Sequence, residues 1–444
     1  MTRQEDEGWE SLHILKDEYE EIRIPESLGS YVQRGIQKGA AEQRKLRRNR
    51  WAVAIASSIL LFMLSGTIRI SPAFASWVGS IPGMDRIVKL ISQDQSLRLA
   101  VEHDFIQPVG ISDEHDGIRV TVDGIIVDEV RMNILFTITP LSKEIPIAGL
   151  PSNYRLTDGS GAQLQAAIGY GMEPSGGVAD QTNGRSIHRR IDVQFIHESE
   201  MPQTAVFEIR DKEGQEPWRI TFPIDHERFK QMKHTFDLNQ TVSLDGQKIT
   251  FSKVTIYPTR TMVEVTFDEA NSKQIFGFRD IRMVNEKGES LTTNMASIVS
   301  PDQRILYFES SFFSVPKHLH LEGSLLTALD KDQLEVIIDP VKKEIVKSPD
   351  KRLRLTHMDH NDDEMGMFFE LDGLEEWDRM AYSLTSNFTD DSGAVYPVGD
   401  RRITSAEKQF IYFKIPYASY QGMLHFKLED YPAPLRQNFR VDIQ

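Results

Sequence analysis

The spacing of apolar residues changes twice along the chain and divides it into three regions. Residues 9–36 repeat apolar side chains every three or four positions, as amphipathic helices do. An apolar run without a charge follows, from Trp51 to Ile68. From residue 110 onward, short runs of alternating apolar and polar residues are separated by turn residues, which indicates strands. The pattern predicts N-terminal helices, one apolar helix and a long, mainly β region.

The apolar run has the length and flanks of a transmembrane helix, which we predict over residues 51–69. As a helix it would be about 27 Å long, close to the roughly 30 Å hydrocarbon core. A cleaved signal peptide carries a charged region of a few residues, not fifty, and a buried helix of a soluble protein is rarely apolar on every face. Basic flanks stay in the cytoplasm, so we expect the N-terminus inside and residues from about 70 onward outside. The basic residues before the run are Arg44, Lys45, Arg47, Arg48 and Arg50.

Charge and cysteine content narrow the class of protein. The net charge of −15 argues against a nucleic-acid binder, which would carry a basic face. The chain has no cysteine, which excludes disulfides, thiolate metal sites and thiol nucleophiles. Animal ectodomains of several domains usually contain disulfides, so a bacterial envelope protein is the better interpretation.

Residues 1–50 are predicted to form a short cytoplasmic helical segment that binds a partner. Trp9, Leu12, Leu15 and Tyr19 fall on one helical face, opposite Glu18 and Glu21. So short a segment cannot bury these side chains by itself, so we interpret the four apolar residues as a partner-binding surface. The alternative is a disordered tail whose periodicity arose by chance.

Residues 70–108 are predicted to be a juxtamembrane helical connector. Ala73 and Ala75 have the spacing of a signal-peptidase site after an apolar segment. Cleavage there would release the region outside the membrane and could begin proteolytic signalling. The alternative is that small residues in an exit loop match this pattern by chance.

The region outside the membrane repeats itself. Residues 116–138 align without a gap on residues 245–267, with Asp, Gly, Thr, Arg and Thr in common. A hairpin follows in each copy, at 155–161 and 282–288, and a third version lies at 388–393. Short strands in units of about 100 residues favour immunoglobulin-like β-sandwiches. We expect three tandem modules, at residues 109–228, 236–343 and 350–444.

No group of residues in the sequence has the pattern of a catalytic or metal site. The Gly-rich stretch 169–177 lacks the lysine and helix of a phosphate loop, and we interpret it as an extended loop of the first module. The polar residues of 357–364 lack the order of a calcium loop, and a solvated hairpin tip explains them. His318 and His320 lie on one strand face, without a third zinc ligand. We therefore expect no enzyme, no cofactor and no metal.

Several motifs resemble a family of Gram-positive membrane proteins that carry domain of unknown function 4179, followed by domain of unknown function 5643. For the first domain the motifs are Ile24-Pro-Glu-Ser-Leu28, Ile70-Ser-Pro-Ala-Phe-Ala75, Ile81-Pro-Gly-Met84, Phe105-Ile-Gln-Pro108 and the strand pair at 118–138; for the second they are Asp237-Leu-Asn-Gln240 and Thr255-Ile-Tyr-Pro-Thr259. Some relatives are regarded as anti-sigma factors. Since the zinc-binding anti-sigma pattern needs cysteines, the resemblance implies a zinc-free interaction.

Two functions fit these observations. In the first, the chain is a single-pass sensor and anti-sigma factor, whose outer modules detect an envelope signal and whose N-terminal helices bind a cytoplasmic sigma factor. In the second, it is a structural or adhesive envelope protein whose inner tail only anchors it. The apolar periodicity of residues 9–36 favours the first. The sequence specifies neither the stimulus nor the oligomeric state.

Overall fold

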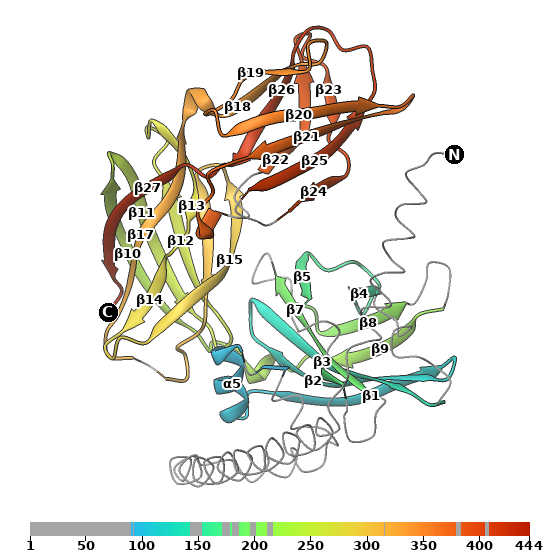
Figure 1. Ribbon diagram of the computed structural model, residues 1–444. Coiled ribbons are helices and arrows are strands. Elements are labelled where there is room, and N and C mark those ends of the chain that lie inside the picture. The colour runs from blue at the N-terminus through green and yellow to red at the C-terminus, as the bar shows by residue number, and fades with distance from the viewer. Residues whose placement is uncertain are drawn as a thin grey trace, which may run out of the picture. The chain divides into compact units, whose positions relative to one another are not determined.

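The computed structural model describes residues 90–91, 93–142, 153–170, 178–179, 186–195, 201–210, 216–314, 316–378, 383–404 and 408–444. The chain divides into two compact units, Met1–Ile70 and Ser71–Gln444, and the described residues all belong to the second. They lie mainly in strands, which form several sheets (Figure 1). The prediction of a mainly β chain is thus confirmed. Within these ranges no helix is long and apolar enough to cross a membrane. The predicted cytoplasmic segment and transmembrane helix lie outside them.

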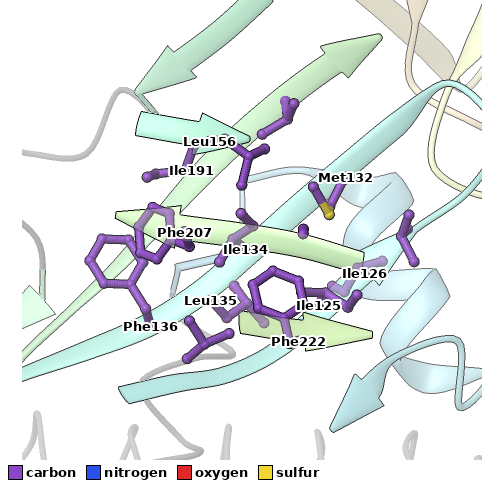
Figure 2. Packing of buried hydrophobic residues seen from close by; sticks show 14 of the residues in the cluster. Ile125, Ile126, Met132, Ile134, Leu135, Phe136, Leu156, Ile191, Phe207 and Phe222 are labelled. Carbon is purple, nitrogen blue, oxygen red and sulfur yellow. The ribbon is translucent and has the colours of Figure 1, made fainter. Parts of the chain in front are cut away.

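The first repeat encloses one apolar core between two sheets. One sheet has the order β1-β2-β3-β7-β5, with β6 also paired to β7, and the other has the order β4-β8-β9. Alternate residues of β3, among them Ile134 and Phe136, pack against Phe207 of β8 (Figure 2). The elements are α5 (Gln95–Glu102), β1 (Gln107–His115), β2 (Ile118–Val127), β3 (Arg131–Pro140), β4 (Asn153–Asp158), β5 (Ala166–Tyr170), β6 (Val178–Ala179), β7 (Ile187–Phe195), β8 (Thr204–Arg210), β9 (Trp218–Pro223) and the 3-10 turn η3 (His226–Arg228).

The second repeat includes a strand from the end of the chain. Its strands follow the order β10-β11-β12-β16-β15-β14-β17-β13, and β27 pairs with β17. Phe251, Phe278 and Phe439 of β27 share the core of this repeat. The elements are β10 (His234–Leu244), β11 (Gln247–Ile256), β12 (Thr261–Phe267), β13 (Lys273–Phe278), β14 (Arg282–Asn285), β15 (Ser290–Ser300), β16 (Gln303–Phe308), β17 (Leu319–Asp330) and β27 (Pro434–Asp442).

The third repeat encloses its core between the sheets β19-β18-β26-β22-β23 and β20-β21-β25-β24. Since β18 pairs with β26 and β27 with β17, strand pairing crosses the predicted boundary between residues 343 and 350 in both directions. The elements are η4 (Lys331–Gln333), β18 (Glu335–Asp339), β19 (Glu344–Lys347), β20 (Leu353–His360), β21 (Glu364–Leu371), η5 (Glu376–Asp378), β22 (Ser383–Asp390), β23 (Val395–Pro397), β24 (Arg401–Ile403), β25 (Gln409–Pro416) and β26 (Leu424–Asp430).

The first two repeats share details of backbone geometry that match their sequence alignment. The β1–β2 pairing is irregular between Pro108 and Ile111, and the β10–β11 pairing between Asp237 and Gln240. Both hairpins turn at an Asp-Gly pair with positive φ at each residue, as type I′ turns require. Such bulges and turns make the strands of the two repeats bend at equivalent places.

The three hairpins predicted at 155–161, 282–288 and 388–393 have one local design. The side-chain oxygens of Asp158, Asn285 and Asp390 each accept hydrogen bonds from the backbone N–H groups two and four residues later. A glycine with positive φ, Gly161, Gly288 or Gly393, follows three residues after each. Short polar side chains that bond to the following backbone explain why these turns form locally.

Candidate functional site: a buried junction between the first two repeats

The residues predicted to contact a partner, Trp9, Leu12, Leu15 and Tyr19, lie outside the described residues. The same holds for the candidate cleavage residues Ala73 and Ala75. Their predictions therefore remain predictions.

The stretches considered as metal or phosphate sites form structural contacts where the structure describes them. His360 stacks on Tyr417, with ring centroids 4.4 Å apart, and His320 Nε2 lies 3.3 Å from Glu322 Oε2. Gly169 belongs to β5, where it pairs with Asp192 of β7, and residues 171–177 lie outside the described ranges. Among the described residues, no three His, Asp or Glu side chains are arranged to hold a metal ion.

A different set of polar residues gathers where the first and second repeats meet. It is built from two equivalent turns, residues 128–131 between β2 and β3 and residues 257–260 between β11 and β12. Each turn is closed by the same backbone hydrogen bond, from Asp128 N to Arg131 O and from Tyr257 N to Arg260 O, at 2.9 and 2.8 Å. We call Asp94, Asp128, Arg131, Asp192, Thr259 and Arg260 the turn junction.

Asp128 joins the two turns directly. Its Oδ2 accepts hydrogen bonds from the backbone N and the hydroxyl of Thr259, at 2.8 and 2.6 Å. Its Oδ1 accepts from the backbone N of Val130 and of Arg131, at 3.1 and 3.0 Å. Asp128 has no exposed surface, and this burial raises the pKa of its carboxyl group. The four donors compensate much of the cost of burying the group.

Arg131 holds three parts of the chain together. Its guanidinium group forms a bidentate pair with Asp192 of β7, with Nε–Oδ1 at 2.8 Å and Nη2–Oδ2 at 2.5 Å. Nη2 also donates to Asp94 Oδ2 at 2.9 Å, and Nη1 to the carbonyl oxygen of Thr259 at 3.0 Å. Burial alone would lower the pKa of Arg131, but the charges of Asp192 and Asp94 raise it overall. Burial alone would raise the pKa of Asp192, but the neighbouring charge of Arg131 lowers it overall.

Arg260, the equivalent of Arg131 in the second repeat, enters the same cluster from the other side. Its Nη1 donates to Gln194 Oε1 at 2.6 Å, and its Nη2 lies 3.4 Å from Asp192 Oδ2. The guanidinium carbon lies 5.4 Å from the centre of the Tyr307 ring, within cation–π range. Burial and the nearby charge of Arg131 lower the pKa of Arg260 to about 10.

The N-terminus of α5 is fixed at this junction. Asp94 is the N-cap of the helix and accepts from Leu97 N at 3.1 Å, while its other oxygen binds Arg131. Gln95 N donates to Glu309 Oε1 at 3.1 Å, and Ser310 N donates to Ser96 Oγ at 2.6 Å, so the first turn of α5 is also bound to the second repeat. Further along, the helix buries Leu97, Ala100 and Val101 in the core of the first repeat.

The chemistry of the turn junction favours fixed orientation. Buried ion pairs add little net stability, because desolvation offsets the attraction, but removal of one partner costs several kcal/mol. Loss of any one of these charges would therefore leave its buried partners uncompensated where the two repeats and α5 meet. Sequence reasoning missed this site. One signal was present: Arg131 and Arg260 coincide in the repeat alignment, although an exposed arginine in each copy would give the same match.

Comparison with known proteins gives two family matches. Residues 45–139 match a domain of unknown function (DUF4179), and residues 233–354 match a family of unknown function (DUF5643). The chain therefore carries these two domains in the predicted order, and the predicted resemblance is confirmed. No curated protein matches the chain. Among solved structures, the crystal structure of the conserved domain protein from Bacillus anthracis is similar, with 12% sequence identity and a TM-score of 0.36, over 55% of this chain and 84% of that one.

Proposed function

We propose that this chain is a single-pass membrane sensor that acts as an anti-sigma factor. Residues 51–69 span the membrane with the N-terminus in the cytoplasm. The β modules outside the membrane detect an envelope signal, and the helices of residues 1–50 bind a sigma factor inside. The chain acts by binding, without an enzymatic activity or a cofactor.

The observation that supports this proposal most is the attachment of α5. This helix belongs to the connector of residues 70–108, which follows the predicted transmembrane helix in the sequence. Its first turn is bound by Arg131 of the first repeat and by Glu309 and Ser310 of the second. A signal that changes how the two repeats meet would therefore act on the connector directly.

We propose that the outer region consists of three immunoglobulin-like sandwiches, at residues 109–228, 236–343 and 350–444. The buried clusters of the described residues support three separate cores. The closing strands of the second and third modules are the exception, because each pairs with the other module. Release of the sigma factor would follow either from movement of the connector or from cleavage beside Ala73 and Ala75.

The proposal is tested with the tagged full-length chain, expressed in a bacterium that encodes it and cross-linked in intact cells before capture. We expect the wild type to recover a sigma factor, because Leu12 and Leu15 supply apolar anchors for a helix in a groove. The variant Leu12→Asp, Leu15→Asp is expected to lose it. The matched control is Glu18→Gln, Glu21→Gln, which changes the opposite helix face and mainly alters salt dependence. Equal recovery by the wild type and the Leu variant, or recovery of no sigma factor by any variant, would favour the structural or adhesive alternative.

A further inference from the structure

One buried arginine of the second repeat lacks a carboxylate partner. The buried arginines among the described residues are Arg131, Arg260 and Arg304. Arg131 and Arg260 both pair with Asp192, with N–O distances of 2.5 and 3.4 Å. Arg304, on β16, is only 5% exposed and forms no ion pair with any residue that the structure describes. Since a buried charge is normally paired, the environment of Arg304 indicates a place for a missing partner.

The guanidinium group of Arg304 is held on one side and free on the other. Its Nη1 donates to three backbone carbonyl oxygens, those of Ser300, Pro301 and Gln303. Its guanidinium carbon lies 5.6 Å from the centre of the Phe267 ring. Neither Nε nor Nη2 forms a hydrogen bond with a described residue, and Nε is buried. Arg131 binds Asp192 through these same two nitrogens. Arg304 therefore presents a fixed edge of the kind that binds a carboxylate with two hydrogen bonds.

A cavity of about 240 Å³ opens beside this arginine. It lies where the second and third repeats meet, a boundary built by exchange of their closing strands: β18 pairs with β26, and β27 with β17. Ile298 of β15 lies directly opposite Arg304 in the sheet and is 69% exposed. The apolar part of the lining comes from both repeats and consists of Phe276, Ile298, Pro301, Leu334 and Leu428. The free edge of Arg304 thus stands next to an apolar wall.

The charges around the cavity favour an anion. Besides Arg304, the lining includes Lys427 and Glu429, two exposed residues of β26, so positive charge exceeds negative charge. Burial lowers the pKa of Arg304, and the attraction of two nearby carboxylates, those of Asp302 and Asp430, opposes this effect. The arginine still carries its charge at neutral pH. A carboxylate in the cavity would compensate for the burial of that charge.

The volume of the cavity limits the size of its ligand. An apolar cavity of about 150 Å³ holds benzene, whereas drug-sized ligands occupy about 300 Å³ or more. We propose that this cavity binds a small carboxylate with an apolar body, an aromatic or short-chain monocarboxylic acid. Its carboxylate accepts hydrogen bonds from Nε and Nη2 of Arg304, and its apolar body packs against Phe276 and Ile298. Binding here goes beyond the proposed anti-sigma function and does not depend on it, so either can fail without the other.

The test measures binding of benzoate to the full-length chain in lipid nanodiscs by ligand-detected NMR, with empty nanodiscs as the background. Benzoate supplies both an aromatic ring and a carboxylate. Benzamide keeps the shape without the charge, and acetate keeps the charge without the ring. We expect saturable binding of benzoate and dissociation constants at least about ten-fold higher for benzamide and for acetate, since each lacks one of the two interactions.

Five variants test the position of the ligand. Arg304→Lys keeps the charge but removes the planar edge and should weaken benzoate binding about ten-fold. Ile298→Ser should weaken it several-fold, whereas the matched control Val341→Ser, at a residue that is 88% exposed and outside the lining, should leave it unchanged. Lys427→Gln should weaken binding and Glu429→Gln should strengthen it, because the two residues place opposite charges at the cavity.

Three results would overturn the proposal. Absence of saturable benzoate binding would exclude the site, and equal affinity for benzoate and benzamide would exclude a role for the charge of Arg304. Benzoate affinity that is unchanged by both Arg304→Lys and Ile298→Ser would place the bound molecule elsewhere. If Arg304→Lys loses its cooperative thermal unfolding, Ile298→Ser and the opposite effects of Lys427→Gln and Glu429→Gln decide the question, because all three residues are exposed.

Discussion

Removal of the Asp128 carboxylate should weaken the attachment of the first repeat to the second. Asp128→Ala leaves the amide and hydroxyl of Thr259 and the amides of Val130 and Arg131 without their acceptor. It also removes a carboxylate from a buried cluster that includes Arg131 and Arg260. Breaking a buried charged network in this way costs about 3–5 kcal/mol.

Thr259→Val removes one of these bonds and keeps the shape of the side chain. A hydrogen bond to a charged acceptor is worth about 1.5–3 kcal/mol, so we expect a loss in that range. In the double variant Asp128→Ala, Thr259→Val, the carboxylate that accepts from the Thr259 hydroxyl is already gone, so Thr259→Val breaks no further hydrogen bond with it. The combined loss should therefore fall short of the sum of the single losses by about 1–2 kcal/mol, which is the coupling between the two turns.

The assay is unfolding of a fragment of residues 71–444 in urea at pH 7.5. It is followed by fluorescence of Trp218, which is buried in the first core, in a background that carries Trp77→Phe and Trp377→Phe so that no other tryptophan contributes. Asp362→Ala, an exposed substitution, serves as control and should change stability by less than about 0.5 kcal/mol. If the single losses add within about 0.5 kcal/mol, Asp128 and Thr259 do not stabilise each other, and the turn junction does not hold the repeats together.

Two further predictions concern burial of charge and local turn geometry. Burial raises the pKa of Asp123 to about 6, against the opposing hydrogen bond from Thr137, so the native state binds a proton that the unfolded state releases between pH 4 and 6. Stability should therefore fall by up to about 3 kcal/mol as pH rises through this window and stay constant above it; Asp123→Asn should remove this dependence in urea titrations at pH 4.5 and 7. Gly161→Ala, Gly288→Ala and Gly393→Ala should each cost about 1–2 kcal/mol, because all three have positive φ, whereas Gly277→Ala should cost less; equal thermal shifts for all four would contradict this explanation.

The elements that sequence patterns predicted well are those whose cause is local. The Asp-Gly pairs at 116–117 and 245–246 were noted only as shared residues of the repeat alignment. Both pairs adopt positive φ, which Asp and Gly tolerate better than most residues, and each turn fixes the register of its two strands. The three hairpins follow from Asp158, Asn285 and Asp390 in the same way. The family resemblance likewise rests on short sequence motifs, and the two family matches confirm it.

The exchange of β18 and β27 could not be predicted from the same evidence. Leu334 and Ile338 match Phe439 and Ile443, so the repeat alignment places both strands in equivalent positions and says nothing about which partner each takes. The choice depends on the short segments that precede these strands, residues 331–334 and 431–433. How far each segment can extend matters only when both acceptor strands, β17 and β26, are already folded. Because the two strands are similar, each can pair with the other repeat, and for the same reason a repeat alignment does not reveal the exchange.

The turn junction was missed for a related reason. A sequence pattern treats a polar residue beside a turn as exposed, and Asp128, Arg131 and Arg260 each stand beside one. They are buried because two equivalent turns meet, with Asp192 and Asp94 contributed from elsewhere in the chain. Long-range charge pairing of this kind leaves no periodic signal.

The junction and the exchanged strands together determine how far a perturbation of one repeat could spread to the others. Modules joined only by flexible linkers move independently, and a ligand on the last one would leave the first unaffected. Here the third repeat shares two strands with the second, and the second binds the first repeat and α5 through Asp128, Arg131 and Ser310. A ligand bound to the third repeat changes α5 only if it favours one of two arrangements of this connected set. Hydrogen exchange of the amides of Gln95 and Leu97, which are bound by Glu309 and Asp94, would report such a change. Asp128→Ala should weaken the response of those amides to a perturbation of the third repeat, and Asp128→Ala combined with Glu309→Ala, which also removes the acceptor of Gln95 N, should weaken it further.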